Sequence, residues 1–213
     1  MNNILFIDTA FAHTQVFIAN EKGVLSQLIN ENTNEQSLTL NTLIQDCLNN
    51  SNLTLKDINA IAVDAGPGSY TGLRVGLGVA KGICFSLDIP IMLFNKLELL
   101  AYPYQQILLV LKARNGEGFA IVKQYDENIM EAQHIFYDNF DWMSYHNIPI
   151  LTDDESLSDQ DLNIKALESH ILEATSWNQQ AQERLKAKQF DDIAYSNPYY
   201  LKSAYPTTPK NRI

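Results

Sequence analysis

The chain has 213 residues, of which 46% are hydrophobic and 19% charged, and its formal net charge at pH 7 is -10. This composition can bury one sizeable core or two small ones and argues against bulk disorder. Proteins that grip nucleic acid unaided concentrate Lys and Arg, whereas the densest basic stretch here is only Arg184, Lys186 and Lys188. The first residues lack the pattern of a signal peptide, and no apolar run approaches the ~20 residues that span a bilayer, so we expect a cytoplasmic protein without membrane contact.

The first hundred residues predict an α/β lobe. Apolar runs predict strands over residues 3–7, 14–19 and 24–30, and Asp8 lies at the first bend. An apolar stripe predicts a helix over residues 34–49, with Thr33 and Gln36 as a capping box. Leu38 lies off this stripe and is either a lone exposed leucine or the edge of a second contact face. A strand over 58–65, a helix to about residue 87, a strand over 89–94 and a helix over 97–102 complete an order typical of a mixed sheet.

The second half of the chain is less regular. Strands are predicted over residues 107–111 and 118–125, as a hairpin around Asn115 and Gly116, and over 129–136 and 148–151. Residues 153–161 are interpreted as a solvated acidic loop. Helices are expected over 164–174 and 178–188, and the proline-bearing tail should be extended. Cys47 and Cys84 fall on predicted helices and are expected to be reduced and buried.

Residues 66–72, with the sequence GPGSYTG, join a predicted strand to a predicted helix. Unpaired N–H groups at the start of a helix can bind an anion. The segment is not a P-loop, because no Gly-Lys-Ser/Thr follows, and its glycine spacing is not that of the dinucleotide-binding motif. Two interpretations stay open: a phosphate-binding loop, and a tight turn without a ligand. Asp64, two residues before Gly66, is expected to help fix the turn.

The helix that follows contains Gly72, Gly76, Gly78 and Gly82, each of which costs ~1 kcal/mol relative to alanine. Gly72 and Gly76 share one face with Ala80, and Gly78 and Gly82 lie on another. Two faces of small residues permit two close backbone approaches, one to the sheet and one to a neighbouring helix in this chain or another. The pattern therefore predicts a protein interface mediated by this helix.

Four segments of the sequence resemble the TsaB family, also called YeaZ. They are the glycine-rich residues 66–77 (GPGSYTGLRVGL), the opening residues 4–10 (ILFIDTA), the hairpin residues 112–117 (KARNGE) and residues 198–202 (PYYLK). The first hundred residues match best, and the middle of the second half matches only in outline. The chain departs from the family at three places: Gln36-Ser37 stands where His-Ser is frequent, Lys112 replaces an Asp, and Lys202 replaces an Arg.

The resemblance implies an α/β, two-lobed actin-like ATPase fold (sugar kinase/heat-shock ATPase superfamily, ribonuclease H-like) with a reduced second lobe. We expect the first lobe over residues 1–103 and the second, with its extended tail, over residues 104–213. Family members are partner subunits of a tRNA threonylcarbamoyladenosine transferase. They form a heterodimer with TsaD, which carries the metal and the chemistry, and the TsaE ATPase joins the pair. The chain would meet tRNA only through the complex, and a homodimer is expected as an alternative when it is alone.

The residues agree with a subunit that has no catalytic site, metal or cofactor of its own, apart from a weak nucleotide contact in the assembled complex. An actin-like ATPase clamps phosphates between two glycine-rich turns, but the last glycines here are Gly116 and Gly118. The four histidines form no helical His-x-x-x-His pair of the kind that binds metal, and histidines scattered in this way are expected on the surface. The predicted partner-interface residues are Leu38, Gly72, Arg74, Gly76, Gly78 and Gly82, and the possible phosphate or nucleotide loop comprises Asp8, Gly66, Gly68 and Ser69.

Two enzymatic alternatives remain open. An ATP-dependent phosphotransferase of the same superfamily would need tight nucleotide binding in the cleft. A peptidase would need a nucleophile beside a base, and Ser37, Ser69 and Cys84 have no evident His partner in the sequence. Asp8 would orient metal and water in an active member, or it is an acidic turn residue that accepts N–H bonds. Arg74 would pair with an acidic residue of a partner or with a local acidic residue.

Overall fold

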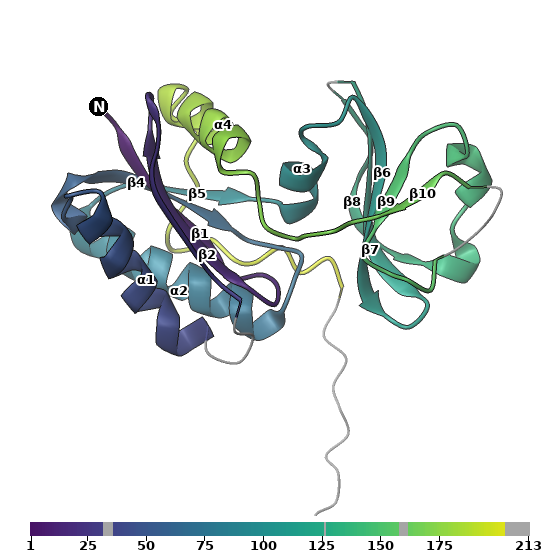
Figure 1. Ribbon diagram of the computed structural model, residues 1–213, viewed down its shortest axis with the longest axis horizontal. Coiled ribbons are helices and arrows are strands. Elements are labelled where there is room, and N and C mark those ends of the chain that lie inside the picture. Colours follow the sequence, from purple (N-terminus) through teal and green to yellow (C-terminus); the bar gives the residue numbers. More distant parts are fainter. Residues whose placement is uncertain (32–35, 126, 158–161, 203–213) are drawn as a thin grey trace, which may run out of the picture.

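Two five-stranded sheets form the two lobes of the molecule (Figure 1). The computed structural model describes residues 1–31, 36–125, 127–157 and 162–202. The expected α/β class is therefore observed, with a mixed sheet in each lobe. The expected capping box of Thr33 and Gln36 lies outside what the structure describes. Among the described residues, no helix has the length and apolar character needed to cross a bilayer.

The first sheet has the strand order β3-β2-β1-β4-β5. Its strands are β1 (Asn3–Asp8), β2 (Thr14–Asn20), β3 (Gly23–Asn30), β4 (Ile58–Asp64) and β5 (Ile91–Phe94). The first three pair antiparallel, whereas β4 lies parallel to β1 and β5 parallel to β4. This strand order is the one that the resemblance to an actin-like, ribonuclease H-like fold implies. Because β1, β4 and β5 are parallel, the residues that follow them meet at one edge of the sheet.

Helices cover both faces of the first sheet. One face packs against α1 (Gln36–Asn50) and α2 (Tyr70–Leu87), and the other packs against α4 (Ala174–Lys186). Strand β1 is accordingly apolar on both sides, with Leu5 facing the first helix pair and Phe6 facing α4. A short turn of 3-10 helix, η1 (Leu55–Asp57), precedes β4, and α3 (Lys96–Ala101) follows β5.

Helix α4 lies on the first lobe, which corrects the expected assignment of residues 104–213 to the second. The indole of Trp177 is fully buried and meets Phe6 and Phe17 edge-on, with ring centroids 5.2 and 5.5 Å apart. The carboxylate of Glu173 caps the helix by accepting hydrogen bonds from the N–H groups of Thr175 and Ser176. The apolar face of α4 thus fills the open side of the first sheet.

The second sheet has the strand order β10-β9-β6-β7-β8. Its strands are β6 (Gln106–Arg114), β7 (Glu117–Gln124), β8 (Glu127–Phe136), β9 (Ile150–Thr152) and β10 (Ile164–Ala166), with the 3-10 helices η2 (Tyr137–Asn139) and η3 (Trp142–Tyr145) between β8 and β9. The predicted hairpin is confirmed, and Gly116 supplies the positive φ of +74° that its turn requires.

The predicted helix over residues 164–174 is wrong. Ile164–Ala166 instead pair in parallel with β9, and the chain then crosses to the first lobe (Figure 1). The side-chain amide of Gln15 both donates to and accepts from the backbone of Leu172, at 2.8 and 3.0 Å. A buried side chain of the first lobe therefore satisfies the crossing backbone, which removes its need for helical hydrogen bonds.

The C-terminal segment, residues 191–202, also joins the two lobes. Asp191 forms an antiparallel bridge with Ile91, and the N–H of Tyr199 donates to the carbonyl of Ala65 at 2.7 Å. Leu201 packs against the apolar core of the second lobe, and the Lys202 ammonium pairs with Glu117 of β7. The segment thus forms one wall of the space between the lobes.

The four glycines of α2 lie on two different faces of the helix, as their spacing suggests. The hydroxyl of Thr9 donates to the carbonyl of Gly72 at 2.7 Å. A Cβ added to Gly76 would lie 2.3 Å from the hydroxyl oxygen of Thr9. Gly72 and Gly76 are buried against β1, so they cannot contact a partner, which corrects their expected place in an interface. A Cβ added to Gly78 or Gly82 would meet nothing within 4 Å. Only this second face is open for close approach.

A matched pair of alanine substitutions tests the difference between the buried face and the open face of α2. Gly76→Ala should lower the free energy of unfolding by about 1–3 kcal/mol, because the added methyl group forces β1 and α2 apart. Gly78→Ala should raise it by up to about 1 kcal/mol, because the helix gains propensity without a clash. Urea unfolding of both variants checks the prediction. Equal effects would mean that the two glycines lie in equivalent environments.

Candidate functional site

A buried ionic cluster lies at the edge where the three parallel strands end. Asp8 ends β1, Asp64 ends β4, and Lys96 begins α3 after β5, and all three side chains are fully buried. The Lys96 ammonium contacts the Asp8 carboxylate at very short range and lies 3.4 Å from Oδ2 of Asp64. His13 Nε2 lies 3.2 Å from Asp8 Oδ2, the same oxygen that the Lys96 ammonium contacts. One lysine thus occupies the space between two acidic side chains.

Local hydrogen bonds hold the cluster in place. The Asp8 carboxylate accepts from the N–H of Ala10 at 3.0 Å, and the Asp64 carboxylate accepts from the N–H of Gly66 at 2.8 Å, as its predicted role in the turn requires. The N–H of Lys96 donates to the carbonyl of Gly66 at 2.8 Å, so α3 begins directly against the same turn. The bond from Ala10 is one that the acidic-turn interpretation of Asp8 expects, and that interpretation omits the lysine.

The two carboxyl groups titrate in opposite directions. Burial alone would raise the pKa of Asp8, but the Lys96 ammonium and His13 lower it below its ordinary value. Burial raises the pKa of Asp64 well above its ordinary value, and the nearby Asp8 carboxylate adds to this rise against the attraction of Lys96. These opposite shifts favour one ionised and one neutral carboxyl group, so the cluster avoids two buried negative charges.

The raised pKa of Asp64 predicts a pH-dependent stability that Asp64→Asn removes. The folded chain holds a proton that the unfolded chain releases above about pH 4, so the free energy of unfolding falls as pH rises from there through the folded-state pKa. The lowered pKa of Asp8 acts only at more acid pH, where stability is lost as pH falls. Urea midpoints measured from about pH 4 upward should therefore decline relative to those of Asp64→Asn. Parallel curves would contradict the assignment.

Several backbone N–H groups of the glycine-rich turn already donate hydrogen bonds within the fold. The N–H of Ser69 donates to the carbonyl of Ala10, and the hydroxyl of Ser69 caps α2 by accepting from the N–H of Gly72 at 3.3 Å. A Cβ added to Gly68 would lie 2.4 Å from the Ala10 carbonyl oxygen, so only glycine fits there. The turn packs directly on the loop after β1, which is the geometry of the tight-turn interpretation of Gly66, Gly68 and Ser69. A phosphate at these amides remains a prediction.

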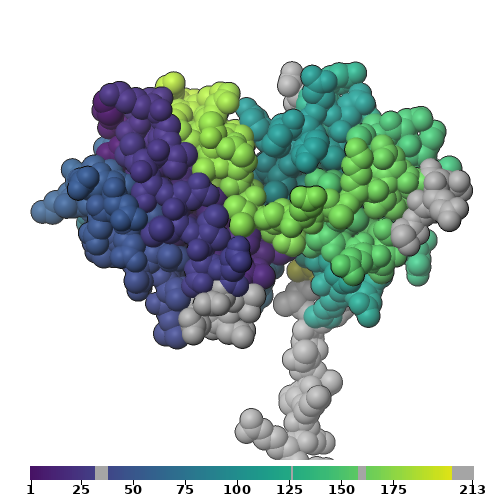
Figure 2. Space-filling model, in the orientation of Figure 1, coloured from purple at the N-terminus to yellow at the C-terminus, as the bar shows by residue number. Residues whose placement is uncertain are grey.

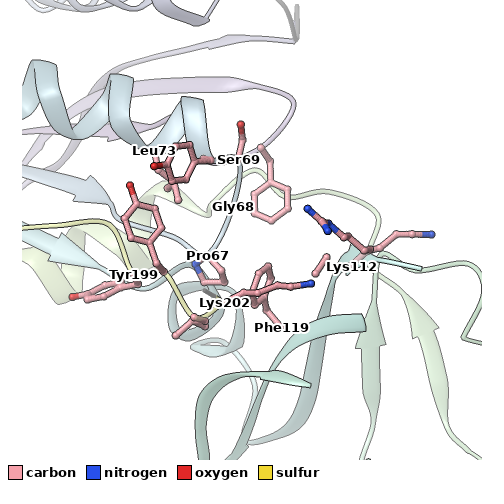
Figure 3. Close-up of a pocket in the computed structure, with 14 residues that line it drawn as sticks. Pro67, Gly68, Ser69, Leu73, Lys112, Phe119, Tyr199 and Lys202 are labelled. Atoms are coloured by element: carbon pink, nitrogen blue, oxygen red, sulfur yellow. The ribbon is translucent and has the colours of Figure 1, made fainter. Parts of the chain in front are cut away.

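A cavity of about 350 Å³ lies between the lobes beside this turn. Figure 3 shows it between Gly68 and Ser69 of the first lobe and Lys112 and Phe119 of the second. The C-terminal segment supplies the remaining wall through residues 199–202. Segments that are far apart in the sequence therefore meet around one cavity.

A second hollow of about 650 Å³ lies between α3 and α4, and Figure 2 shows it as a notch beside the second lobe. The Arg184 guanidinium at its wall donates to the carbonyl of Leu93 at 2.6 Å and pairs with Asp191 at 2.9 Å. These bonds fix α4 and the C-terminal segment on β5. The Arg184 side chain at this hollow therefore has a structural role.

Three sequence-based interpretations need correction or completion. His13 is buried against Asp8, although scattered histidines were expected on the surface. Asp154, expected in a solvated loop, is buried, and although burial alone would raise its pKa, hydrogen bonds from Lys112 and Ser156 lower that pKa to about 2. Arg74 binds locally, through the hydroxyl of Tyr200 at 3.0 Å, rather than an acidic residue. Leu38 is 76% exposed on α1, which fits both of its interpretations, a lone exposed leucine and the edge of a second contact face.

Comparisons with known proteins agree with this architecture. The family model described as "TsaD: tRNA N6-adenosine threonylcarbamoyltransferase" matches residues 10–202. The YeaZ structure from Pseudomonas aeruginosa superposes with a TM-score of 0.76 at 19% sequence identity, over 94% of this chain and all of that one. A second Pseudomonas aeruginosa structure, described as similar to peptidase YEAZ, gives a TM-score of 0.78 at 19% identity, over 95% of this chain and all of that one. These structures establish the fold.

Several curated relatives bear the name "tRNA threonylcarbamoyladenosine biosynthesis protein TsaB". The protein from Buchnera aphidicola of Schizaphis graminum is 36% identical over 54% of this chain and 58% of its own length, and that from Escherichia coli K12 is 33% identical over 59% and 56%. The matches thus span under three fifths of the length of these relatives. The chain belongs to the family that the matching model describes. Its similarity to the cited TsaB proteins covers 54% and 59% of the chain, and the YeaZ structure shares its fold.

Proposed function

We propose that this chain is a non-catalytic subunit in tRNA threonylcarbamoyladenosine biosynthesis, which forms a heterodimer with TsaD and supports its transfer reaction. The names of the TsaB relatives support the process, and the family model supports kinship with the transferase itself. TsaE would join the pair, and tRNA would be held by the complex rather than by this acidic chain. The chain needs no metal or cofactor of its own in this role.

The observation that carries the proposal is the position of Lys96. In an active member of this superfamily an acidic residue at the first bend orients metal and water. Here Asp8 lies at that bend, but its carboxylate is fully buried and already paired with the Lys96 ammonium. A buried ammonium repels a divalent cation and excludes the water that such a cation would bring. This arrangement favours a structural role for Asp8 over a catalytic one.

The outer face of α2, together with Leu38 of α1, fits a partner surface, which we call the α1–α2 surface. Phe85 is 82% exposed, and the open glycines Gly78 and Gly82 lie two turns and one turn before it, respectively. Exposed large apolar side chains beside positions without side chains allow a partner helix to approach closely. The same surface could serve a homodimer when the partner is absent.

The enzymatic alternatives have weaker support. A phosphotransferase would need the acidic edge of the cleft for its metal, and Lys96 already occupies it. A peptidase would need an activated nucleophile. Burial raises the pKa of the Cys84 thiol to about 12, so the reactive thiolate is not formed at neutral pH. The hydroxyl of Ser69 accepts the N–H of Gly72 as a helix cap.

Size-exclusion chromatography of the chain mixed with TsaD from the same organism tests the heterodimer directly. A stoichiometric complex, absent from runs of either protein alone, is the expected result. TsaE and ATP are added in a second series, because the small ATPase is expected to join a preformed pair. Clean separation at micromolar concentrations in both series would contradict the proposal.

A further inference from the structure

The cavity between the lobes concentrates positive charge in an acidic protein. Among the residues that the structure describes, its charged lining side chains are Lys112, Arg114 and Lys202, in a chain whose net charge is -10. Two of them come from the β6–β7 hairpin and the third from the C-terminal segment. This cluster is invisible in the sequence, because the fold alone brings residues 112–114 and 202 together.

The three cations differ in how their charge is compensated. The Lys112 ammonium binds the Asp154 carboxylate at 2.9 Å and points away from the cavity in Figure 3. The Lys202 ammonium pairs with Glu117, which His134 also contacts at 2.9 Å. Within the described part of the chain, Arg114 has no ion pair. Its guanidinium is therefore the uncompensated charge at the cavity.

Arg114 and Lys202 lie close enough to repel one another. Loss of hydration and the neighbouring guanidinium of Arg114 together lower the pKa of Lys202. An anion between the two cations would relieve that repulsion and gain charge-assisted hydrogen bonds. The charge distribution of the cavity thus favours a phosphate or carboxylate group.

Aromatic rings surround the same cavity and extend to its mouth. Tyr70 and Tyr200 both line it, are 50% and 43% exposed, and have ring centroids 5.3 Å apart. The Arg74 guanidinium lies 3.9 Å from the centroid of the Tyr70 ring and donates to the hydroxyl of Tyr200, which fixes both rings. Half-exposed, fixed rings beside cations are the combination that binds a base and its phosphate.

We propose that this cavity binds a nucleotide without a metal ion, with Arg114 and Lys202 holding the phosphate and the Tyr70–Tyr200 pair contacting the base. Such a ligand can be a free mononucleotide or an unpaired nucleotide of an RNA single strand. The proposal does not rest on the pairing with TsaD, because every residue involved belongs to this chain.

Calorimetric titration of the chain alone tests the site with four probes: AMP, adenosine, inorganic phosphate and a single-stranded RNA tetranucleotide. AMP or the tetranucleotide should bind, more weakly as salt rises, and better than adenosine or phosphate. Arg114→Gln should weaken binding by about tenfold or more. Lys56→Gln, an equal loss of charge beside the opposite end of β4, should leave binding unchanged.

A second pair of variants tests the aromatic contact. Tyr200→Leu should weaken binding about tenfold, whereas Tyr200→Phe, which keeps the ring and loses only the bond to Arg74, should bind nearly as well as the wild type. Tyr195→Leu, at a tyrosine that is 82% exposed and outside the cavity, is the matched control. Thermal unfolding of each variant verifies that it is folded.

Each outcome of these titrations either supports or overturns the proposed site. Tighter binding of AMP identifies a free nucleotide as the ligand, and tighter binding of the tetranucleotide identifies RNA; either result supports the site. Absence of binding by both at millimolar concentration overturns it. Phosphate that binds as well as AMP, with no effect of Tyr200→Leu, also overturns it. None of these results depends on TsaD, so failure here leaves the heterodimer untouched.

Discussion

Lys96→Met should lower the free energy of unfolding by about 3–5 kcal/mol, because it removes the ammonium that pairs with the buried Asp8 carboxylate. A methionine has nearly the volume of the lysine stem, so the loss reflects charge rather than a cavity. Urea unfolding at neutral pH measures the change. Lys56→Met, which removes an exposed lysine, should cost less than about 0.5 kcal/mol in the same experiment.

The double variant Asp8→Asn with Lys96→Met isolates the ion pair. Asp8→Asn alone should also be strongly destabilising, because it buries an unpaired ammonium. The double variant should recover most of the loss, because neither charge remains and the amide oxygen can still accept from Ala10. Additive losses in the double variant would mean that Asp8 and Lys96 act independently, against the close contact between them.

Phe85→Glu should weaken binding to TsaD at least about thirtyfold without lowering the stability of the chain. The side chain is 82% exposed, so the fold does not depend on it, whereas a carboxylate in a buried apolar contact is costly. Fluorescence anisotropy or calorimetry with labelled chain measures the affinity. Ile129→Glu, a similar change on β8 where the side chain is 55% exposed, is the matched control on the second lobe.

Gly78→Leu provides an independent test of the same surface. A leucine at this open position should fold normally and weaken binding if a partner helix approaches α2 closely. Normal affinity of both Phe85→Glu and Gly78→Leu would place the interface elsewhere on the molecule. Gly76→Leu is unsuitable for this purpose, because its side chain would collide with Thr9 and perturb the fold.

The first lobe is largely predictable from the sequence, because local patterns dominate there. The apolar runs of β1 and β2, the stripe of α1 and the glycine-rich start of α2 each indicate the element that the structure contains. The division of the α2 glycines into two faces also follows from spacing alone. Which face lies against the sheet does not, since both consist of small residues.

The ionic cluster could have been found from the sequence by a topological argument. Asp8, Asp64 and Lys96 each stand at or just after the end of a predicted strand, and parallel strands end at one edge. Lys96 escapes notice because lysines are almost never fully buried unless paired. The partner that permits its burial is 88 residues away in the chain.

The second lobe and the cavity cannot be predicted from local sequence patterns. The stretch over residues 164–174 has a helical spacing of apolar residues, but pairing of Ile164–Ala166 with β9 and the bonds of Gln15 to Leu172 override it. The cavity depends on the return of residues 199–202 to the hairpin at 112–117. Contacts at such sequence separations leave no periodic signal.

Reconstituted threonylcarbamoylation of tRNA by TsaD, with this chain as the added subunit, tests the central claim most directly. The rate with the folded double variant Asp8→Asn with Lys96→Met is compared with that of the wild type and of TsaD alone. A non-catalytic subunit predicts equal rates for wild type and variant, both well above TsaD alone. A variant that forms the complex normally but lowers the rate tenfold or more would contradict the account and assign chemistry to Asp8.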